Sequence, residues 1–346
     1  MLKAKKLFLS IMVVSIFVIG IFSLTSCNKG DDSGKIIDKE NFSTIKNDYQ
    51  LYKESKPQVM PEGEDIVIDG ANYDINGVTT DSAGNVTSII EIDVSKDKLN
   101  PTNGTQELKK LVECFVDIDQ SGYSQNDYQY IYDCIFDGHS SIQITNGTKK
   151  ATLDKIVENS KNLISNRISS TDKVLIHKSS GKVTWKVNIE KAGFYNLYLN
   201  YFTVSGYSSS IERKLMINGE IPFEGADSFT FSRVWKDDPQ SYDENGALKV
   251  DTNGNDIKPQ QIEVFTFKEG YFKDDMGYVT EPYMFYFEEG ENEISLISIK
   301  EPILIDQLHI QSVSQTPTYE EYLAALKEKY GEPSLNNQTT GAMQAE

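Results

Sequence analysis

The strongest constraint on the fold is a two-residue alternation of apolar and polar side chains that begins at Val174. Residues 183–189 alternate cleanly, a turn follows at 190–193, and residues 194–202 alternate again. Further runs lie at 229–235, 262–267, 283–287, 294–299 and 303–310. Asn218 and Gly219 mark a hairpin, because both residue types tolerate a positive φ. Seven or eight short antiparallel strands of this kind predict a β-sandwich.

A helical period replaces this alternation between residues 105 and 166. Leu108, Leu111, Val112 and Phe115 recur at i, i+3, i+4 and i+7, and similar stripes follow at 128–135 and 153–164. The pattern predicts three short helices.

Residues 64–70 read as a strand that enters a turn, so the sandwich domain is expected to span 48–316 with a helical insertion at about 85–170. A C-terminal helix and tail, residues 317–346, would lead toward a further domain that the sequence lacks.

The first 27 residues have the features of an export signal. Lys3, Lys5 and Lys6 precede an apolar run over residues 7–24, which ends in Leu-Thr-Ser-Cys at 24–27. This ending resembles the bacterial lipoprotein signal, in which the cysteine, here Cys27, becomes the lipidated N-terminus. The alternative is a simple transmembrane anchor, since such a run could nearly span a bilayer. We expect a lipid-anchored protein on the extracytoplasmic face of the cell membrane, with residues 28–47 as a flexible tether.

The formal net charge is −18. Removal of the signal takes away three lysines and no acids, which leaves −21. So acidic a chain, with no basic cluster beyond its first residues, excludes nucleic acid and anionic lipids as ligands. The two other cysteines, Cys114 and Cys134, would form a disulfide or remain buried thiols, and their spacing leaves both alternatives open.

Four segments carry a family resemblance: residues 192–197, 208–213, 231–235 and 281–287. They are similar to the carbohydrate-binding-module-like, galactose-binding-like jelly-roll domains attached to sugar ABC-transporter solute-binding lipoproteins of Gram-positive bacteria. The resemblance covers 174–315 and the strand near Ile66, and residues 343–346 resemble the first strand of another such domain. Residues 85–170 fit the pattern poorly, and the two-lobed solute-binding domain is absent. The resemblance therefore implies glycan binding more than transport, with an ABC sugar permease as a candidate partner.

Sugar-binding sandwiches stack apolar sugar faces on aromatic rings and hold hydroxyl groups with charged and amide side chains. The predicted loops supply such residues for an oligosaccharide or polysaccharide ligand: Tyr207, Glu212, Arg213, Arg233, Trp235, Tyr278 and Tyr283. For each the alternative is a structural role. Trp235 could belong to the core, and Glu212 with Arg213 could form an ion pair.

A structural Ca²⁺ is common in the resembled class, held by an acid of the first strand and one of the last. Asp69 and Asp306 match these places, and carboxylate oxygens suit calcium. Asp117, Asp119 and Ser121 also resemble the opening of an EF-hand loop. Because the twelfth position is Tyr128 rather than an acid, a plain turn between helices is favoured there.

Catalytic motifs are missing from the sequence: it contains no GxSxG elbow, HExxH helix or phosphate-cradling glycine loop. We therefore expect a non-enzymatic, carbohydrate-binding surface lipoprotein. One alternative is a structural or protein-interaction module, which would bury Trp235 and Tyr278 beside a flat apolar patch. A glycoside hydrolase accessory or remnant would instead show two carboxylates about 5–10 Å apart in one cleft.

Overall fold

The computed structural model describes residues 48–116, 122–313 and 319–331. The signal segment with Cys27, the tether, the EF-hand-like residues Asp117, Asp119 and Ser121, and the segment 343–346 lie outside the described residues. In the part that is described, no helix is long and apolar enough to cross a membrane.

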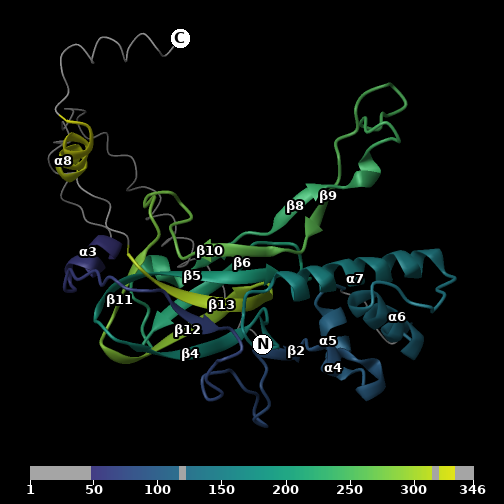
Figure 1. Cartoon of the computed structure of the whole chain (residues 1–346), viewed down its shortest axis with the longest axis horizontal. Helices are drawn as coiled ribbons and strands as arrows, with labels where there is room; N and C mark the ends of the chain where they lie inside the picture. Colours follow the sequence, from purple (N-terminus) through teal and green to yellow (C-terminus); the bar gives the residue numbers. More distant parts are fainter. Residues whose placement is uncertain (1–47, 117–121, 314–318, 332–346) are drawn as a thin grey trace, which may run out of the picture. The chain divides into compact units, whose positions relative to one another are not determined.

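Two antiparallel sheets form the body of the protein (Figure 1). In the larger sheet the order is β10-β5-β13-β3-β2, with β1 beside β13 and β11 beside β5; in the smaller it is β4-β12-β6-β7. The larger sheet comprises β1 (Ile66–Asp69), β2 (Ile89–Asp93), β3 (Lys173–His177), β5 (Gly193–Thr203), β10 (Phe267–Tyr271), β11 (Met284–Phe287) and β13 (Ile303–Ser312). The smaller comprises β4 (Gly181–Ile189), β6 (Ile211–Ile217), β7 (Phe229–Phe231) and β12 (Gly290–Lys300).

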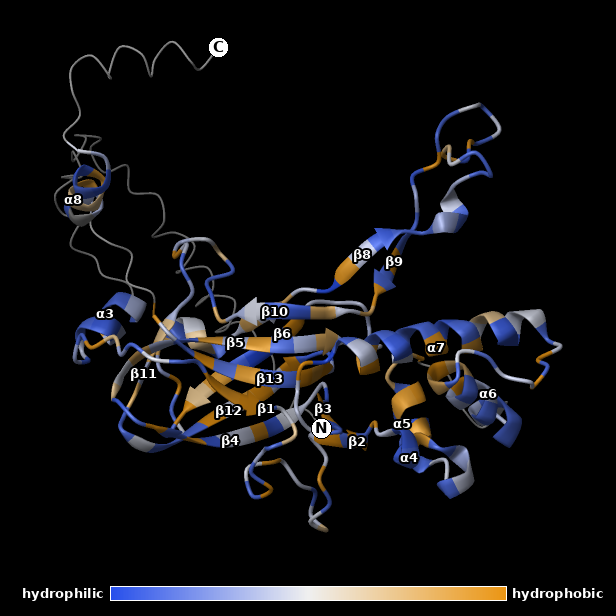
Figure 2. Ribbon diagram, viewed as in Figure 1, coloured by the Kyte–Doolittle hydropathy of each residue, from blue (hydrophilic) through white to orange (hydrophobic). Residues whose placement is uncertain are grey.

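One apolar core lies between the two sheets. Trp185 and Leu215 of the smaller sheet are buried in the same cluster as Leu199 and Ile305 of the larger. The alternation in the sequence has its physical cause here, because every second side chain of a strand points to the same face. Figure 2 shows hydrophobic residues on the strands of both sheets. The molecule is therefore an antiparallel β-sandwich, which confirms the predicted fold class.

The helices between β2 and β3 build a second core. They are α4 (Lys96–Leu99), the 3₁₀ turn η1 (Pro101–Asn103), α5 (Gln106–Glu113), α6 (Gln125–Phe136) and α7 (Gly147–Asn166). Leu111, Ile131 and Ile156 pack with Phe202 and Leu304 of the sandwich in one cluster. The helices therefore cover part of the outer face of the larger sheet.

Two details of this region differ from the predictions. The last helix, α7, has 20 residues and is not short. In addition, β2 lies inside the stretch predicted as insertion, yet it pairs with β3, with Ile90 opposite Ile176. The alternation is hidden in β2 because Ile89 contacts one core and Ile92 the other, so both faces of the strand are apolar.

A two-stranded hairpin, which we call the arm, projects from the sandwich (Figure 1). It consists of β8 (Val234–Asp237), β9 (Gln261–Val264) and the chain between them, which begins with the 3₁₀ turn η4 (Pro239–Ser241). The sequence predicted one strand over residues 229–235. The structure divides it into β7 and β8, because Arg233 turns into the protein interior between them.

The described chain also contains α3 (Asp48–Glu54), the 3₁₀ turn η3 (Glu224–Asp227) and α8 (Tyr319–Tyr330). The phenolic oxygens of Tyr49 and Tyr52 on α3 accept hydrogen bonds from the backbone N–H groups of Met284 and Tyr286, at 2.9 and 2.8 Å. The helix therefore covers the edge strand β11, whose N–H groups would otherwise need another acceptor.

Cys114 and Cys134 are both free thiols. The disulfide alternative is thus wrong, and the thiol alternative describes Cys114, which is buried, better than Cys134, which is only half-buried. The Cys114 thiol donates to the carbonyl oxygen of Lys110 one helical turn earlier, at 3.3 Å.

Candidate functional site

The tight turn between β12 and β13 gathers residues from four other segments. Its central residue, Glu301, has a φ of 59°, a left-handed conformation that non-glycine residues rarely adopt. Arg213 donates to the carbonyl oxygens of Lys300 and Glu301 at 2.7 and 2.8 Å. The Lys300 ammonium group pairs with the Glu212 carboxylate at 2.7 Å. Two adjacent residues of β6 therefore hold the turn from both sides.

Arg213 is fully buried without a carboxylate partner. Its remaining N–H groups donate to the carbonyl oxygens of Glu212 and His177 and to Nδ1 of His177, so all five donors of the guanidinium group are used. His177 Nε2 faces the carbonyl oxygen of Gly181 at 3.2 Å. Nδ1 must accept and Nε2 must donate, which assigns the neutral tautomer. Burial and the Arg213 charge lower the pKa of His177 to about 3, in agreement with this assignment.

Arg233, Glu263 and Glu301 form a buried ionic cluster, which we call the Arg233 cluster. Arg233 Nη2 lies 2.9 Å from the Glu301 carboxylate, and Nη1 pairs with Glu263 of the arm. Nη1 and Nε also donate to the carbonyl oxygens of Val204 and Ser209, both at 2.9 Å. The side chains of Arg233 and Glu301 are each only 2% exposed.

The pKa values of the two carboxylates in the Arg233 cluster shift in opposite directions. Burial would raise the pKa of Glu301, but hydrogen bonds from Ser209 and Tyr207 and the charge of Arg233 hold it below its ordinary value. Burial raises the pKa of Glu263 although Arg233 acts in the opposite direction. Arg233 therefore pairs with two buried carboxylates in different surroundings.

The loop between β5 and β6 closes over this cluster. The backbone N–H groups of Tyr207 and Ser209 donate to the Glu301 carboxylate at 2.9 and 3.3 Å, and the Ser209 hydroxyl donates at 2.7 Å. A Cβ atom on Gly206 would lie 2.0 Å from the same carboxylate. Only glycine allows the loop to approach so closely.

Two aromatic side chains project from this base. Tyr207 is 87% exposed, and Trp235 of the arm is 42% exposed. Trp235 is opposite Glu263 in the hairpin, so both side chains lie on the same face of the arm. Since Glu263 belongs to the Arg233 cluster, both rings emerge from segments that one buried network holds together.

A polar cleft of about 600 Å³ lies between α7 and the base of the arm. Asn159 and Asn162 of α7 line one side, and Lys236 and Gln240 line the other. The Asn162 amide donates to the carbonyl oxygen of Phe265 at 2.6 Å and so connects the helix to the residue that directly follows the arm. This arrangement offers amide and charged groups beside the arm that carries Trp235.

The structure brings five of the seven predicted ligand residues together around the turn at Glu301, but not all of them can touch a ligand. Arg213, Arg233 and Tyr283 are buried, so their prediction as ligand contacts is wrong. The two arginines instead hold the turn and the arm. Tyr283 packs in the aromatic core, 4.5 Å from the ring of Tyr49. Buried in this way, none of the three presents a surface to a sugar.

The two remaining residues, Glu212 and Tyr278, are neither fully buried nor exposed beside the turn. Glu212 is half-buried and paired with Lys300. The predicted ion pair between Glu212 and Arg213 is therefore wrong, because Arg213 donates only to carbonyl oxygens and to His177. Tyr278 is 82% exposed, but it lies in the loop between β10 and β11, and not at the turn. Asp274 shapes that loop by accepting the backbone N–H groups of Tyr278 and Val279.

Sequence reasoning missed Glu263 and Glu301, the acids of the cluster. Glu301 lies between two predicted strand runs, and Glu263 lies within the alternating run 262–267. Each acid has a basic partner far away in the chain, so neither shows a local signal. Four hydrogen bonds from Tyr207, Ser209 and Arg233 occupy the Glu301 carboxylate, which does not suit it for acid or base catalysis.

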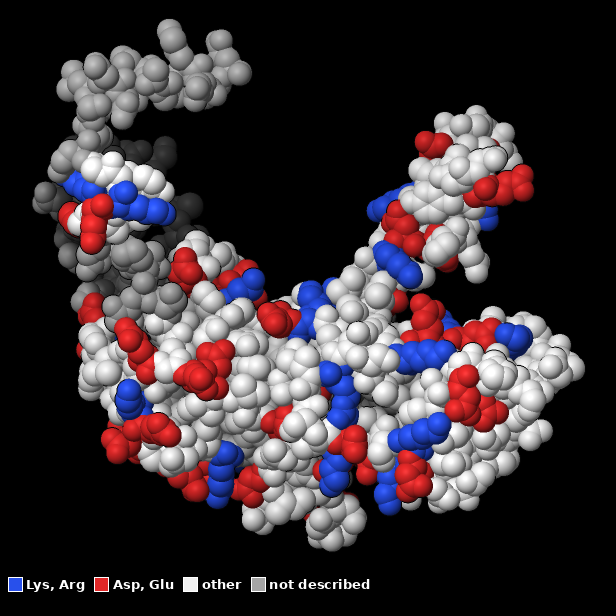
Figure 3. Space-filling model, in the orientation of Figure 1, with Lys and Arg blue, Asp and Glu red and all other residues white. Residues whose placement is uncertain are grey.

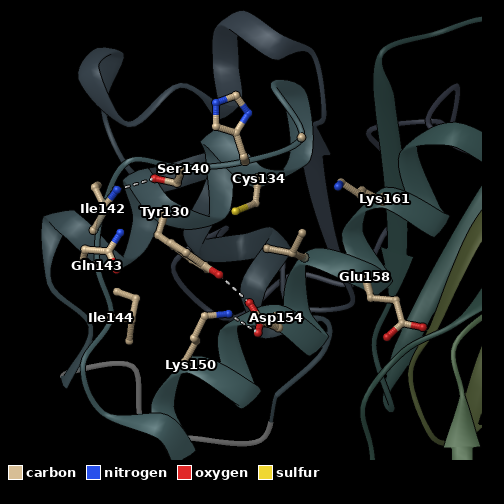
Figure 4. A pocket seen from close by; sticks show the side chains of 13 residues that line it. Tyr130, Cys134, Ser140, Ile142, Gln143, Ile144, Lys150, Asp154, Glu158 and Lys161 are labelled. Atoms are coloured by element: carbon tan, nitrogen blue, oxygen red, sulfur yellow. Dashed lines mark hydrogen bonds and ion pairs between the residues drawn. The ribbon is translucent and has the colours of Figure 1, made fainter.

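A second cavity, of about 700 Å³, lies in the helical insertion (Figure 4). There Asp154 accepts from the Tyr130 hydroxyl at 2.5 Å and from the Lys150 ammonium group at 2.7 Å. Burial raises the pKa of the Cys134 thiol, which keeps it protonated at neutral pH and weakly nucleophilic. None of the predicted ligand residues lines this pocket.

Asp69 and Asp306, the predicted calcium ligands, lie near each other. Asp69 is opposite Gln307, and the N–H of Gly70 donates to the carbonyl oxygen of Asp306 at 2.7 Å. Asp306 Oδ2 accepts the backbone N–H groups of Ile168 and Ser169, whereas the buried Oδ1 has no hydrogen-bond partner among the described residues. Burial raises the pKa of Asp306. A cation would satisfy this oxygen, although no group of three or more acid, histidine or cysteine side chains suited to a metal occurs in the described chain.

Comparison with known proteins yields likenesses to solved structures only. No family model and no curated protein matches the chain. A family 35 carbohydrate-binding module from Clostridium thermocellum is 17% identical, with a TM-score of 0.26 over 42% of this chain and 82% of that chain. Modules of that family from Paenibacillus barcinonensis and Cellvibrio japonicus are 12% and 15% identical, both with TM-scores of 0.25, over 43% and 44% of this chain and 83% and 81% of theirs. The ladders and shared core define the sandwich independently of these likenesses.

The Arg233 cluster predicts a large loss of stability when its cation is removed. Arg233→Ala leaves two buried carboxylates without their counter-charge, so we expect the free energy of unfolding to fall by about 3–5 kcal/mol. Urea denaturation followed by circular dichroism measures it. The matched control is Lys96→Ala, which removes the exposed ion pair with Asp137 and should cost about 0–1 kcal/mol. Equal losses in both variants would contradict the role of the cluster.

Proposed function

We propose that this protein binds carbohydrate without catalysing its cleavage. The observation that carries the proposal is the pair of exposed rings, Tyr207 and Trp235, held on the rigid, buried Arg233 cluster. Because the network holds the backbone segments that carry the rings, little loop ordering is needed when an apolar sugar face stacks on them.

The cleft beside the arm supports the same ligand class. Its amide and charged groups suit sugar hydroxyls, which both donate and accept hydrogen bonds. On the face drawn in Figure 3, acidic and basic side chains are interspersed over the described surface. With a net charge of −18, the protein favours neutral glycans over acidic ones.

Exposure of the rings favours a glycan over a protein partner. The protein-interaction alternative expects Trp235 and Tyr278 to be buried beside a flat apolar patch, but both are exposed. The hydrolase alternative expects two carboxylates that face one cleft. Glu301 is buried and bound to Arg233, so it does not act as such a group.

The binding proposal predicts that the two exposed rings carry affinity. Tyr207→Ala and Trp235→Ala should each weaken binding at least about tenfold, or about 1.4 kcal/mol, with little change in thermal stability because both rings are exposed. A glycan array identifies a ligand, and calorimetry with it measures the variants.

Tyr330→Ala is the matched control, since Tyr330 is an exposed ring on α8. Tyr278→Ala, measured in parallel, shows whether the loop between β10 and β11 takes part. The proposal is refuted if the protein binds no cell-wall or plant glycan, or if both ring variants bind with wild-type affinity.

We further propose that Asp69 and Asp306 hold a structural calcium ion, in which Asp306 Oδ1 finds its missing partner. Calcium at a hundredfold excess over its dissociation constant should then raise the melting temperature by about 5 °C relative to EDTA. Asp306→Asn should abolish this difference, and Asp137→Asn, at an exposed acid, should retain it. A melting temperature that is insensitive to calcium in the wild type would exclude the ion.

The sequence supports a proposal on location: lipidation of Cys27 anchors the protein at the cell surface, where an ABC sugar permease is the proposed partner. Cys27→Ser should lose incorporation of an alkyne-labelled fatty acid and leave the membrane fraction. Cys134→Ser is the matched control and should remain labelled and membrane-bound. Labelling that persists in the Cys27→Ser variant would rule out this anchor.

A further inference from the structure

The outer face of the larger sheet is covered at its two ends by different elements. At one end, Phe202 and Phe267 pack with the helical insertion. At the other end, Phe194 contacts Tyr52 of α3, with ring centroids 6.2 Å apart. Between these two ends lies a surface formed by the outward side chains of β10, β5, β13 and β1.

A row of rings crosses this surface. Tyr271 of β10 is opposite Tyr198 of β5, which is opposite His309 of β13, and His309 is opposite the exposed Val67 of β1. The rings of Tyr198 and His309 stack at 4.2 Å with an interplanar angle of 13°, and those of Tyr198 and Tyr271 lie 4.9 Å apart. Four strands at the usual spacing make the row about 14 Å long.

Polar residues flank the row on both sides. On one side Glu269, Asn200, Gln307 and Asp69 stand opposite one another in register. On the other side lie Asn196, Gln311 and Asp65, whose carboxylate accepts from Gln311 at 3.3 Å. We call the ring row and its two polar flanks the platform.

Hydrogen bonds hold the rings in position. The Tyr271 hydroxyl donates to Gln311 at 3.0 Å, and His309 Nε2 lies 3.1 Å from Gln307 Oε1. Burial lowers the pKa of His309, and burial together with the charges of Asp65 and Glu269 raises the pKa of Tyr198 to about 12. At neutral pH the stacked rings are uncharged.

The chemistry of the platform selects its ligand. Tyr198 and Tyr271 are half-buried, which leaves part of each ring accessible, and Glu269 and Asp65 are exposed at the rim. His309, Asn200 and Gln307 are buried between them and support the two tyrosine rings. The flanks contain carboxylates and amides without a lysine or arginine, which disfavours anions. The backbone groups of β5 and β13 are engaged in ladders on both sides, so no peptide strand can add there. Apolar ring faces between rows of acceptors fit a neutral sugar chain.

We propose that the platform is a second glycan site, which binds an extended, uncharged polysaccharide across the strands. It uses none of the residues of the site at the turn near Glu301. Its ligand class is that of the proposed function, but its residues are independent.

Because the chain has three histidines, NMR spectroscopy can follow each histidine side chain separately. The full-length protein, labelled with ¹³C at histidine, is titrated with soluble galactomannan, xylan and mixed-linkage β-glucan. The signals of His309 are assigned with the His309→Gln variant. We expect one of these polymers to shift the His309 signals, through the half-buried rings stacked beside it, and to leave those of His177, which lies outside the platform, unchanged.

Variants separate the platform from the site at Glu301. Tyr271→Ala should remove the His309 shift and weaken binding at least about tenfold in affinity electrophoresis, whereas Tyr271→Phe, which retains the ring, should behave as the wild type. Trp235→Ala should leave the His309 shift in place, and this result would support the platform even if the site at Glu301 bound no glycan. The platform is overturned if none of the three polymers moves the His309 signals, if Tyr271→Ala binds as the wild type does, or if Trp235→Ala abolishes the shift.

Discussion

Two buried guanidinium groups determine the geometry at one end of this sandwich. Arg213 satisfies all five of its N–H groups without a carboxylate, and Arg233 binds Glu263, Glu301 and two carbonyl oxygens. A buried charge is tolerated only when its hydrogen bonds are complete, since the desolvation penalty is several kcal/mol per ion. The loop after β5, the base of the arm and the turn at Glu301 must therefore remain where these arginines need them. Tyr207 and Trp235 belong to the loop and the arm that are held in this way.

The helices decide which other surfaces of the sandwich remain open. The insertion buries Phe202 and Leu304, which would otherwise be apolar side chains on the outside of the larger sheet. At the opposite end, α3 closes the edge of β11 with two tyrosine hydroxyls. The platform around Tyr198 lies between these two covered ends. This sheet face carries stacked rings flanked by amides and by the carboxylates of Asp65, Asp69 and Glu269.

The sequence predicts which residues of the site lie near one another, but not which of them contact each other. The sequence pattern places Tyr207, Arg213, Arg233 and Trp235 at strand ends or between strands, and strand ends of a sandwich meet. Strand-end position does not distinguish a side chain that points to solvent from one that points inward. That choice depends on partners far away in the chain, such as Glu301 for Arg233, which no local pattern shows. Likewise, two tyrosines and a histidine become a stacked row only through the pairing of β10, β5 and β13.

The sequence by itself determined the antiparallel sandwich and the helices that interrupt it, because periods of two and of 3.6 are local properties of the chain. It did not reveal β2, whose two faces contact two cores, nor the free state of Cys114 and Cys134. Only the tertiary structure decided which polar residues are buried and which rings are exposed. The physical reason is that burial, ion pairing and register depend on contacts between residues separated by tens to hundreds of positions along the chain, as between Asp69 and Gln307.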